Sequence, residues 1–210
     1  MRGLRPFTIS LLALGAASAA TFAGFSIKPN GSQKLNIQTG TTVLEQGGSA
    51  TDAGRGLTVE GKYIEYKDGD FLRAKTAILT TRAGGRMTAD SADYDAKGGA
   101  LTATGHIAYS DPRLKGLVAD SATVSKSGVV VARGKVHSEQ PSLSANTLAV
   151  DYQNSRAVLY GNYRYNANGT VLGSPKNDAT LYITWDKSGK TSATSKPTAE
   201  QLAVFRDFLK

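Results

Sequence analysis

A repeated pair of strand motifs is the feature that most limits how this chain can fold. Each copy opens with an apolar-x-Ala-Asp/Asn motif, passes through turn residues, and closes with an apolar-x-apolar-x-Gly-x-apolar motif. The copies occupy residues 87–107, 117–136 and 143–163, and half-copies occur at 57–63 and 72–79. Both motifs alternate apolar and polar residues with a period of two, which is typical of half-buried strands. The repeat therefore predicts an all-β body of stacked hairpins.

The closing strand of each copy has one apolar face that also carries a glycine. Side chains at alternate positions point to the same side of a strand, so this face is predicted to be the inner one. Together with a residue of an opening strand, it gives the predicted interior set: Leu101, Ala103, Ile107, Leu117, Val130, Ala132, Val136, Leu159 and Tyr163. The glycines at matching positions are Gly61, Gly105, Gly134 and Gly161. A strand glycine marks a bend or a close approach of another group. These glycines therefore either let the sheet layers curve or leave notches for a ligand.

The hydrophobic pattern divides the chain into a β body and shorter flanking segments. Period-two alternation and turn sequences assign residues 35–186 to the β domain. Residues 20–34 are predicted to be a flexible N-terminal segment, and the Lys-, Ser- and Thr-rich residues 187–197 a polar linker. A short helix is predicted over residues 198–210, because Thr198 and Gln201 fit a capping box. We expect its apolar stripe to pack on the body; the alternative is a plug at one end of the sheet.

The first residues have the pattern of an export signal. Arg2 and Arg5 precede an apolar stretch over residues 7–17, and Ala17-Ser18-Ala19 gives a small-x-small cleavage sequence. We therefore interpret residues 1–19 as a cleaved signal peptide and place the protein in the periplasm or cell envelope. An uncleaved N-terminal anchor is the alternative. The sequence has 0 cysteines, so an exported fold must be held by strand pairing and burial alone.

Composition and motifs limit the classes of function. The net charge of +8 fits either a solubility role or attraction to an anionic partner. Nucleic acid is not expected as a partner, because no basic helix or basic–aromatic strand motif is present. The sequence also has no nucleophile elbow, phosphate loop or metal-spaced cluster around its two histidines, His106 and His137. We therefore expect no enzymatic activity, no metal site and no cofactor.

At the repeat, the chain resembles the OstA-like, LptA-type family of periplasmic lipopolysaccharide-transport proteins. The resemblance lies in the strand openings Ala89-Asp90, Ala119-Asp120 and Ala145-Asn146 and in the closing glycines named above. It implies a twisted, partly open β-jelly roll with an apolar groove for acyl chains. It also implies lipopolysaccharide or another envelope amphiphile as ligand, envelope transport proteins as partners, and stacking of like domains. Residues 165–210 have no counterpart in this pattern and would hinder stacking if they covered one end.

These observations leave two functional hypotheses. In the first, the interior is an open groove that holds lipid acyl chains, and basic side chains at its rim meet the head group. The rim candidates are Arg133, Lys135 and Arg164, with Arg113, Lys115 and Arg156 as further candidates. In the second, the core is filled, and the protein is a structural envelope component that binds glycan or self-associates through strand edges. The two hypotheses differ in whether the interior is hollow.

Overall fold

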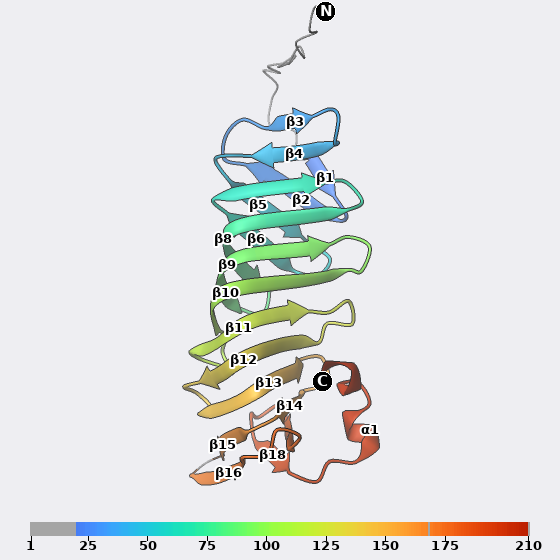
Figure 1. Cartoon of the computed structure of the whole chain (residues 1–210). Helices are drawn as coiled ribbons and strands as arrows, with labels where there is room; N and C mark the ends of the chain where they lie inside the picture. The colour runs from blue at the N-terminus through green and yellow to red at the C-terminus, as the bar shows by residue number, and fades with distance from the viewer. Residues whose placement is uncertain (1–19, 168, 210) are drawn as a thin grey trace, which may run out of the picture.

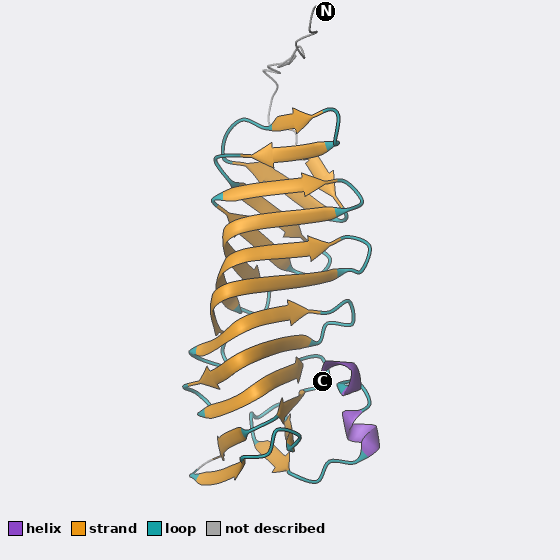
Figure 2. Cartoon of the chain, viewed as in Figure 1, coloured by secondary structure: helices purple, strands orange, loops and turns teal. Residues whose placement is uncertain are grey.

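The strands form one antiparallel sheet that is folded along a corner into two layers. The structure is a computed structural model that describes residues 20–167 and 169–209 (Figure 1). Within these residues the sheet has 18 strands, stacked along the long axis of an elongated molecule. Figure 2 shows that strands dominate the chain and that helix is confined to its C-terminal end. The predicted all-β, partly open jelly roll of repeated hairpins with a short C-terminal helix is thereby confirmed.

Strands β8 to β13 are long, and the strands on either side of them are short. The N-terminal strands are β1 (Ala20–Phe22), β2 (Phe25–Pro29), β3 (Lys34–Asn36), β4 (Thr41–Leu44), β5 (Gly48–Asp52), β6 (Leu57–Gly61) and β7 (Tyr63–Lys67). The long strands are β8 (Phe71–Thr81), β9 (Arg86–Asp95), β10 (Ala100–Ser110), β11 (Leu117–Val124), β12 (Val130–Ser138) and β13 (Leu143–Asp151). The C-terminal strands are β14 (Arg156–Tyr160), β15 (Tyr163–Ala167), β16 (Thr170–Ser174), β17 (Thr180–Trp185) and β18 (Thr191–Thr194).

Each long strand belongs to both layers. The first part of β8 pairs with β7, and its last part pairs with β6. Likewise, β13 pairs with β15 through Leu143 and Ser144 and with β14 through residues 147–151. We call the layer that contains β3, β4, β7, β14, β17 and β18 the first layer, and the layer that contains β1, β2, β5, β6, β15 and β16 the second layer.

The repeat glycines form the corner between the layers. Gly105 and His106 have φ values of 74° and 46°, and Gly134 and Lys135 have values of 75° and 48°. Strand register shifts at these pairs, as at a β-bulge. Gly161 and Asn162 repeat the geometry between β14 and β15, with φ values of 72° and 44°. Two successive left-handed residues turn the strand from one layer into the other, a conformation that glycine adopts without steric cost.

The Asp/Asn of each strand opening faces the glycine of the next closing strand. A Cβ on Gly105 would collide with the carboxylate of Asp90, and a Cβ on Gly134 with that of Asp120. Gly161 faces Asn146 in the same way. Gly61 ends β6 without a left-handed φ, and a Cβ there would come within 3.0 Å of the Ala74 methyl group. Neighbouring residues, not ligand space, surround all four glycines, and Gly105, Gly134 and Gly161 lie at the bend.

The N-terminal half of the interior is filled by aromatic side chains. The rings of Phe25 and Tyr94 are 5.0 Å apart, and those of Phe22 and Tyr66 are 5.9 Å apart. Arg55 donates a 3.0 Å hydrogen bond to the Tyr94 hydroxyl and so covers the cluster on its outer side. Phe22 and Phe25 come from the second layer, and Tyr66 and Tyr94 come from the first. The two layers are therefore in direct contact here.

The structure differs from the prediction of a flexible segment over residues 20–34. Strand β2 pairs with β5 from Phe25 to Pro29, and Phe22, Phe25 and Ile27 are completely buried. The period-two pattern is present in this segment, but the Ala23-Gly24 turn interrupts it after a few residues. The predicted signal peptide, residues 1–19, lies outside the described residues.

The C-terminal segment packs on the outer surface of the sheet. Helix α1 (Ala199–Leu202) begins with the predicted capping box of Thr198 and Gln201 and is followed by the short 3₁₀ helix η1 (Arg206–Phe208). Phe205 is fully buried between them, in a cluster with Val129, Val131, Ala149, Val158 and Tyr182. The helical structure is thus broken, unlike the single predicted helix, but it packs on the body as expected and does not plug an end.

Part of the predicted linker is also ordered into the sheet. Residues 191–194 form β18, which pairs with β17. The turn between them is closed by Asp186, whose carboxylate accepts hydrogen bonds from the backbone of Ser188 and Lys190. None of the helices in the described ranges is long and apolar enough to cross a membrane.

The corner predicts a difference between two glycines with similar backbone angles. Gly134→Ala should lower the free energy of unfolding by about 3 kcal/mol, because it combines left-handed strain with a methyl group 2.8 Å from the Asp120 Cβ. Gly69→Ala is the control, since Gly69 has a φ of 67° but no atom within 4 Å of the added carbon. It should cost about 1 kcal/mol. Urea denaturation measures both, and equal losses would show that the corner is not tightly packed.

The turn after β13 predicts a pH dependence of stability. Burial opposes ionisation of Asp151, but hydrogen bonds from Asn154 and Arg156 outweigh it and lower the pKa of this carboxyl. A lowered pKa in the folded state stabilises the protein above the unfolded pKa, and this contribution is lost as the pH falls below about 4. Asp151→Asn should therefore cost about 2 kcal/mol at pH 7 and less at pH 3. Asp93→Asn, in the exposed Arg73 pair, should cost under about 1 kcal/mol.

Candidate functional site

The C-terminal half of the interior is hollow. A cavity of about 400 Å³ lies between the two layers, beyond the end of the filled aromatic core. Its apolar walls come from β13, β14, β17 and the turns of the second layer: Leu114, Pro141, Leu143, Leu148, Val150, Ala157 and Ile183. Aromatic and polar residues line the remainder: Arg113, Tyr152, Tyr165, Asn166, Trp185 and Thr191. This volume lies within the range of about 300–1,000 Å³ that small-molecule sites occupy.

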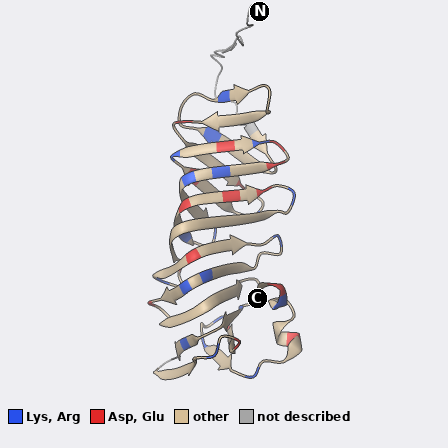
Figure 3. Cartoon of the chain, in the orientation of Figure 1, with Lys and Arg blue, Asp and Glu red and all other residues tan. Residues whose placement is uncertain are grey.

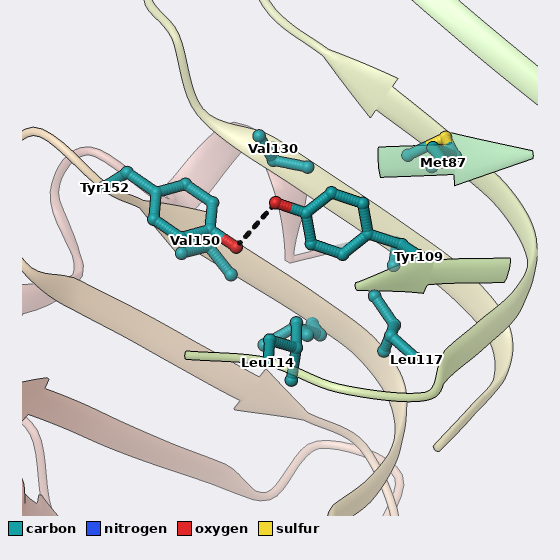
Figure 4. A pocket seen from close by; sticks show the side chains of 10 residues that line it. Met87, Tyr109, Leu114, Leu117, Val130, Val150 and Tyr152 are labelled. Atoms are coloured by element: carbon teal, nitrogen blue, oxygen red, sulfur yellow. Dashed lines mark hydrogen bonds between the residues drawn. The ribbon is translucent and has the colours of Figure 1, made fainter. Parts of the chain in front are cut away.

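A second, much smaller hollow adjoins the cavity toward the filled core. Its volume is about 10 Å³, and it shares Leu114, Leu148, Val150 and Tyr152 with the cavity (Figure 4). The other lining residues include Met87, Tyr109, Leu117, Val130 and Ala132. A space of this size holds about one water molecule. The hollow part of the interior therefore ends beside Tyr109 and Met87.

A hydrogen-bonded pair of tyrosines joins the two layers beside the cavity. Tyr109 lies in the second-layer part of β10, and Tyr152 follows the first-layer part of β13. Their hydroxyls are 3.4 Å apart, and the Tyr109 hydroxyl donates a 2.8 Å hydrogen bond to Asp111 (Figure 4 shows the tyrosine pair). Asp111 in turn accepts hydrogen bonds from the backbone N–H groups of Arg113 and Leu114, at 2.7 and 2.6 Å. The tyrosines thus hold the 110–117 turn at the cavity wall.

Burial sets the protonation state of this tyrosine pair. It raises the pKa of Tyr109 above its usual value, and the hydrogen bond to the Asp111 carboxylate raises it further. Burial also raises the pKa of Tyr152, and the neighbouring Tyr109 and Asp111 act in the same direction. Both phenols therefore stay protonated at neutral pH and serve as structural hydrogen-bond donors.

Arg113 and Trp185 line the cavity from opposite layers, and because Arg113 is exposed we take this end of the cavity as its opening. The Arg113 guanidinium, from the second-layer turn, is 5.9 Å from the centre of the Trp185 ring of the first layer. The Trp185 ring also meets the Tyr152 ring edge-on at 6.4 Å. The opening therefore has a cationic group above an aromatic surface, directly outside apolar walls.

The structure brings only part of the predicted interior set next to a cavity. Leu117, Val130 and Ala132 line the small hollow. The other six lie in the closed core between the layers and are each at most 5% exposed: Leu101, Ala103, Ile107, Val136, Leu159 and Tyr163. The period-two pattern identified the inner face correctly, but it does not report how closely the opposite layer approaches that face.

The three main rim candidates are not at the cavity opening. Arg133 donates a 3.0 Å hydrogen bond to the Phe208 carbonyl, beneath the C-terminal segment on the outer surface. Lys135 is exposed at the corner, and Arg164 is an exposed residue of β15 between the inward-facing Tyr163 and Tyr165. Of the further candidates, Arg113 does line the cavity. Trp185 and Ile183 also line the cavity but were not predicted, although the only tryptophan of the chain marks their strand.

Comparisons with known proteins include a distant structural likeness. No protein-family model matches the chain, and no curated protein matches it. Among solved structures, the chain is similar to LptH from Pseudomonas aeruginosa, described as the LptA-homologous periplasmic component of the lipopolysaccharide transport device. The match covers 82% of this chain and 95% of LptH, with 10% sequence identity and a TM-score of 0.37. At this score and identity, no functional conclusion follows from the likeness.

The tyrosine pair predicts a stability effect. Tyr109→Phe should lower the free energy of unfolding by about 1–2 kcal/mol, because it removes the donor to Asp111 and leaves Tyr152 without this partner. Tyr63→Phe is the control, since the Tyr63 hydroxyl has no hydrogen bond to the described residues and lies largely in water. Its effect should stay within about 0.5 kcal/mol. Thermal or urea unfolding of both variants tests this, and a harmless Tyr109→Phe would contradict the assigned role.

Proposed function

We propose that this protein is a non-catalytic envelope protein that holds the acyl chain of an amphiphile in the cavity between its two sheet layers. The amphiphile is lipopolysaccharide or another envelope lipid, and the protein helps to carry it between membranes through the periplasm. The observation that supports this proposal is the apolar cavity of about 400 Å³ in the C-terminal half.

The energy for this binding comes from the apolar walls. Each methylene group moved from water into such a cavity contributes roughly 0.8 kcal/mol. Leu148, Val150 and Ile183 offer apolar surface from the first layer, and Leu114 and Leu143 offer it from the second. A chain inserted between the layers would contact both walls. A polar head group would remain at the opening, near Arg113 and Trp185, and so avoid the cost of burial.

The ends of the sheet fit contacts with other chains. Strand β3 pairs only with β4 within the described part of the chain, and Leu35 and Ile37 at that end are 63% and 78% exposed. At the other end, β16 pairs only with β15, as far as the chain is described, and Val171 is 49% exposed. Exposed strand edges with apolar side chains favour pairing with further strands. We propose that these edges serve self-association or contact with envelope transport proteins.

Charge on the outer surface is mixed. Figure 3 shows basic and acidic residues interspersed over the face of the sheet that it presents. Part of this charge is used in exposed pairs, such as Arg73 with Asp93 at 2.9 Å and Lys97 with Asp70 at 3.0 Å. This distribution favours a solubility role for the outer surface and gives no support to nucleic acid as a partner.

A structural envelope protein is the second candidate. The filled N-terminal interior, with its cluster of Phe22, Phe25, Tyr66 and Tyr94, favours it, because a ligand has no access to this half. In that case the C-terminal cavity is a packing defect, and the function resides in the strand edges or in glycan binding.

Filling the cavity separates the two candidates. Ala157 lines the cavity, so Ala157→Leu should weaken binding of a fluorescent fatty acid at least tenfold without loss of stability. Ala108→Leu makes the same change at an exposed position of β10 and should bind as the unchanged protein does. Unchanged binding by Ala157→Leu would rule out this cavity as the site. Absence of probe binding, and of lipid extracted with the purified protein, would favour the structural candidate.

A further inference from the structure

We propose that the opening of the cavity is a head-group site that selects anionic amphiphiles, with Arg113 as the charged anchor and the indole N–H of Trp185 as a second donor. The proposal rests on the proposed function, since the acyl chain has to occupy the cavity behind these two residues. It adds the class of ligand: a chain that ends in a phosphate or carboxylate group and enters the cavity singly.

Arg113 suits this role because its guanidinium has no hydrogen-bond acceptor or carboxylate partner among the described residues and touches only the Trp185 ring. Within the described ranges, five arginine side chains bond to a carboxylate, a hydroxyl or a carbonyl: Arg55, Arg73, Arg82, Arg133 and Arg156. The guanidinium of Arg113 has no such bond to the described residues, and it alone among their arginines lines the cavity. Arginine binds carboxylate and phosphate groups with paired hydrogen bonds. Its free donors at an apolar opening therefore match an anionic head group.

The 110–117 turn fixes the backbone of Arg113. The carboxylate of Asp111 in this turn already accepts hydrogen bonds from other groups. Asp111 accepts the backbone N–H groups of Arg113 and Leu114 and the hydroxyl of Tyr109. Pro112 further limits the backbone between them. These three donors stabilise the Asp111 carboxylate without the Arg113 side chain. The guanidinium therefore stays available while the backbone that carries it is fixed.

Trp185 provides an independent indication that an acceptor belongs here. Its indole nitrogen is buried and has no hydrogen-bond partner, and it is the one such side-chain atom found in the described residues. Leaving a donor unpaired in the interior is costly, and such groups are few in native proteins. Trp185 lines the cavity and faces Arg113 across the opening. An oxygen of an anionic head group inside the cavity would pair this donor.

The size of the cavity limits how much of a ligand enters. About 400 Å³ lies near the lower end of the usual range of small-molecule sites. The hollow also ends at Tyr109 and Met87, where only about 10 Å³ remains. A single chain fits between these limits, and a lipid with several chains would leave the others outside. The geometry thus assigns one chain and one head group to each protein molecule.

The only tryptophan of the chain is at the site, so intrinsic fluorescence reports binding directly. The probes are laurate, dodecyl phosphate and dodecanol, below their aggregation concentrations. The unchanged protein should bind both anions at least tenfold more tightly than the neutral dodecanol. Arg113→Gln should weaken binding of the anions by about tenfold to a hundredfold and leave dodecanol binding unchanged. Arg164→Gln, which removes an exposed charge of β15, is the matched control and should bind as the unchanged protein does.

Trp185→Phe tests the second donor. With a fluorescent fatty acid as displaced probe, this variant should lose about threefold to tenfold in affinity for laurate and little for dodecanol. Equal effects on both probes would remove Trp185 from the proposal and mark it as part of the apolar wall.

The outcomes distinguish this proposal from the proposed function. Equal binding of dodecanol and the anions, or anion binding that is unchanged in Arg113→Gln, overturns the head-group site. The proposed function survives that result if Ala157→Leu still blocks the chain. Failure of all three probes to bind the unchanged protein overturns both. A preference for only one of the two anions supports the site and identifies its head group.

Discussion

The left-handed corner is the constraint on which the remainder of the structure depends. In the three complete repeats, a glycine and the residue after it turn the backbone, and an Asp or Asn of the opening strand occupies the space in front of that glycine. This arrangement folds one sheet into two layers at a fixed spacing. The apolar faces then lie opposite each other, and the two rows of turns lie at the far edges. The interior, its filled half and its cavity all follow from this geometry.

What fills the interior differs along the molecule because the side chains differ in size. In the N-terminal half, four aromatic rings span the gap and bring the layers into contact. In the C-terminal half, residues such as Ala157, Val150 and Leu143 are too small to meet across it. The tyrosine pair lies at the boundary between the two halves. Packing on the outer surface, where Phe205 is buried, supports the hollow half from behind.

Strand positions could be predicted from the sequence because alternation with a period of two is a local property. The hairpins and the capping box of Thr198 and Gln201 were predictable for the same reason. The role of Gly105 was not, since a bend and a ligand notch place a glycine on the same face. Nor was the position of Arg133, which depends on where the distant Phe208 carbonyl docks. The cavity depends on the distance between layers, which no local pattern encodes.

Each hairpin pairs only with its direct neighbours, so such a chain can change in length by whole hairpins. Contacts run along one dimension, as in repeat proteins, so the cross-section and the length are set independently. Duplication or deletion of one repeat, such as residues 117–136 with its following turn, would extend or shorten the molecule by two strand spacings, about 9.5 Å. The corner, the two layers and the remaining hairpins would keep their geometry, and the span of the protein would be adjustable in steps.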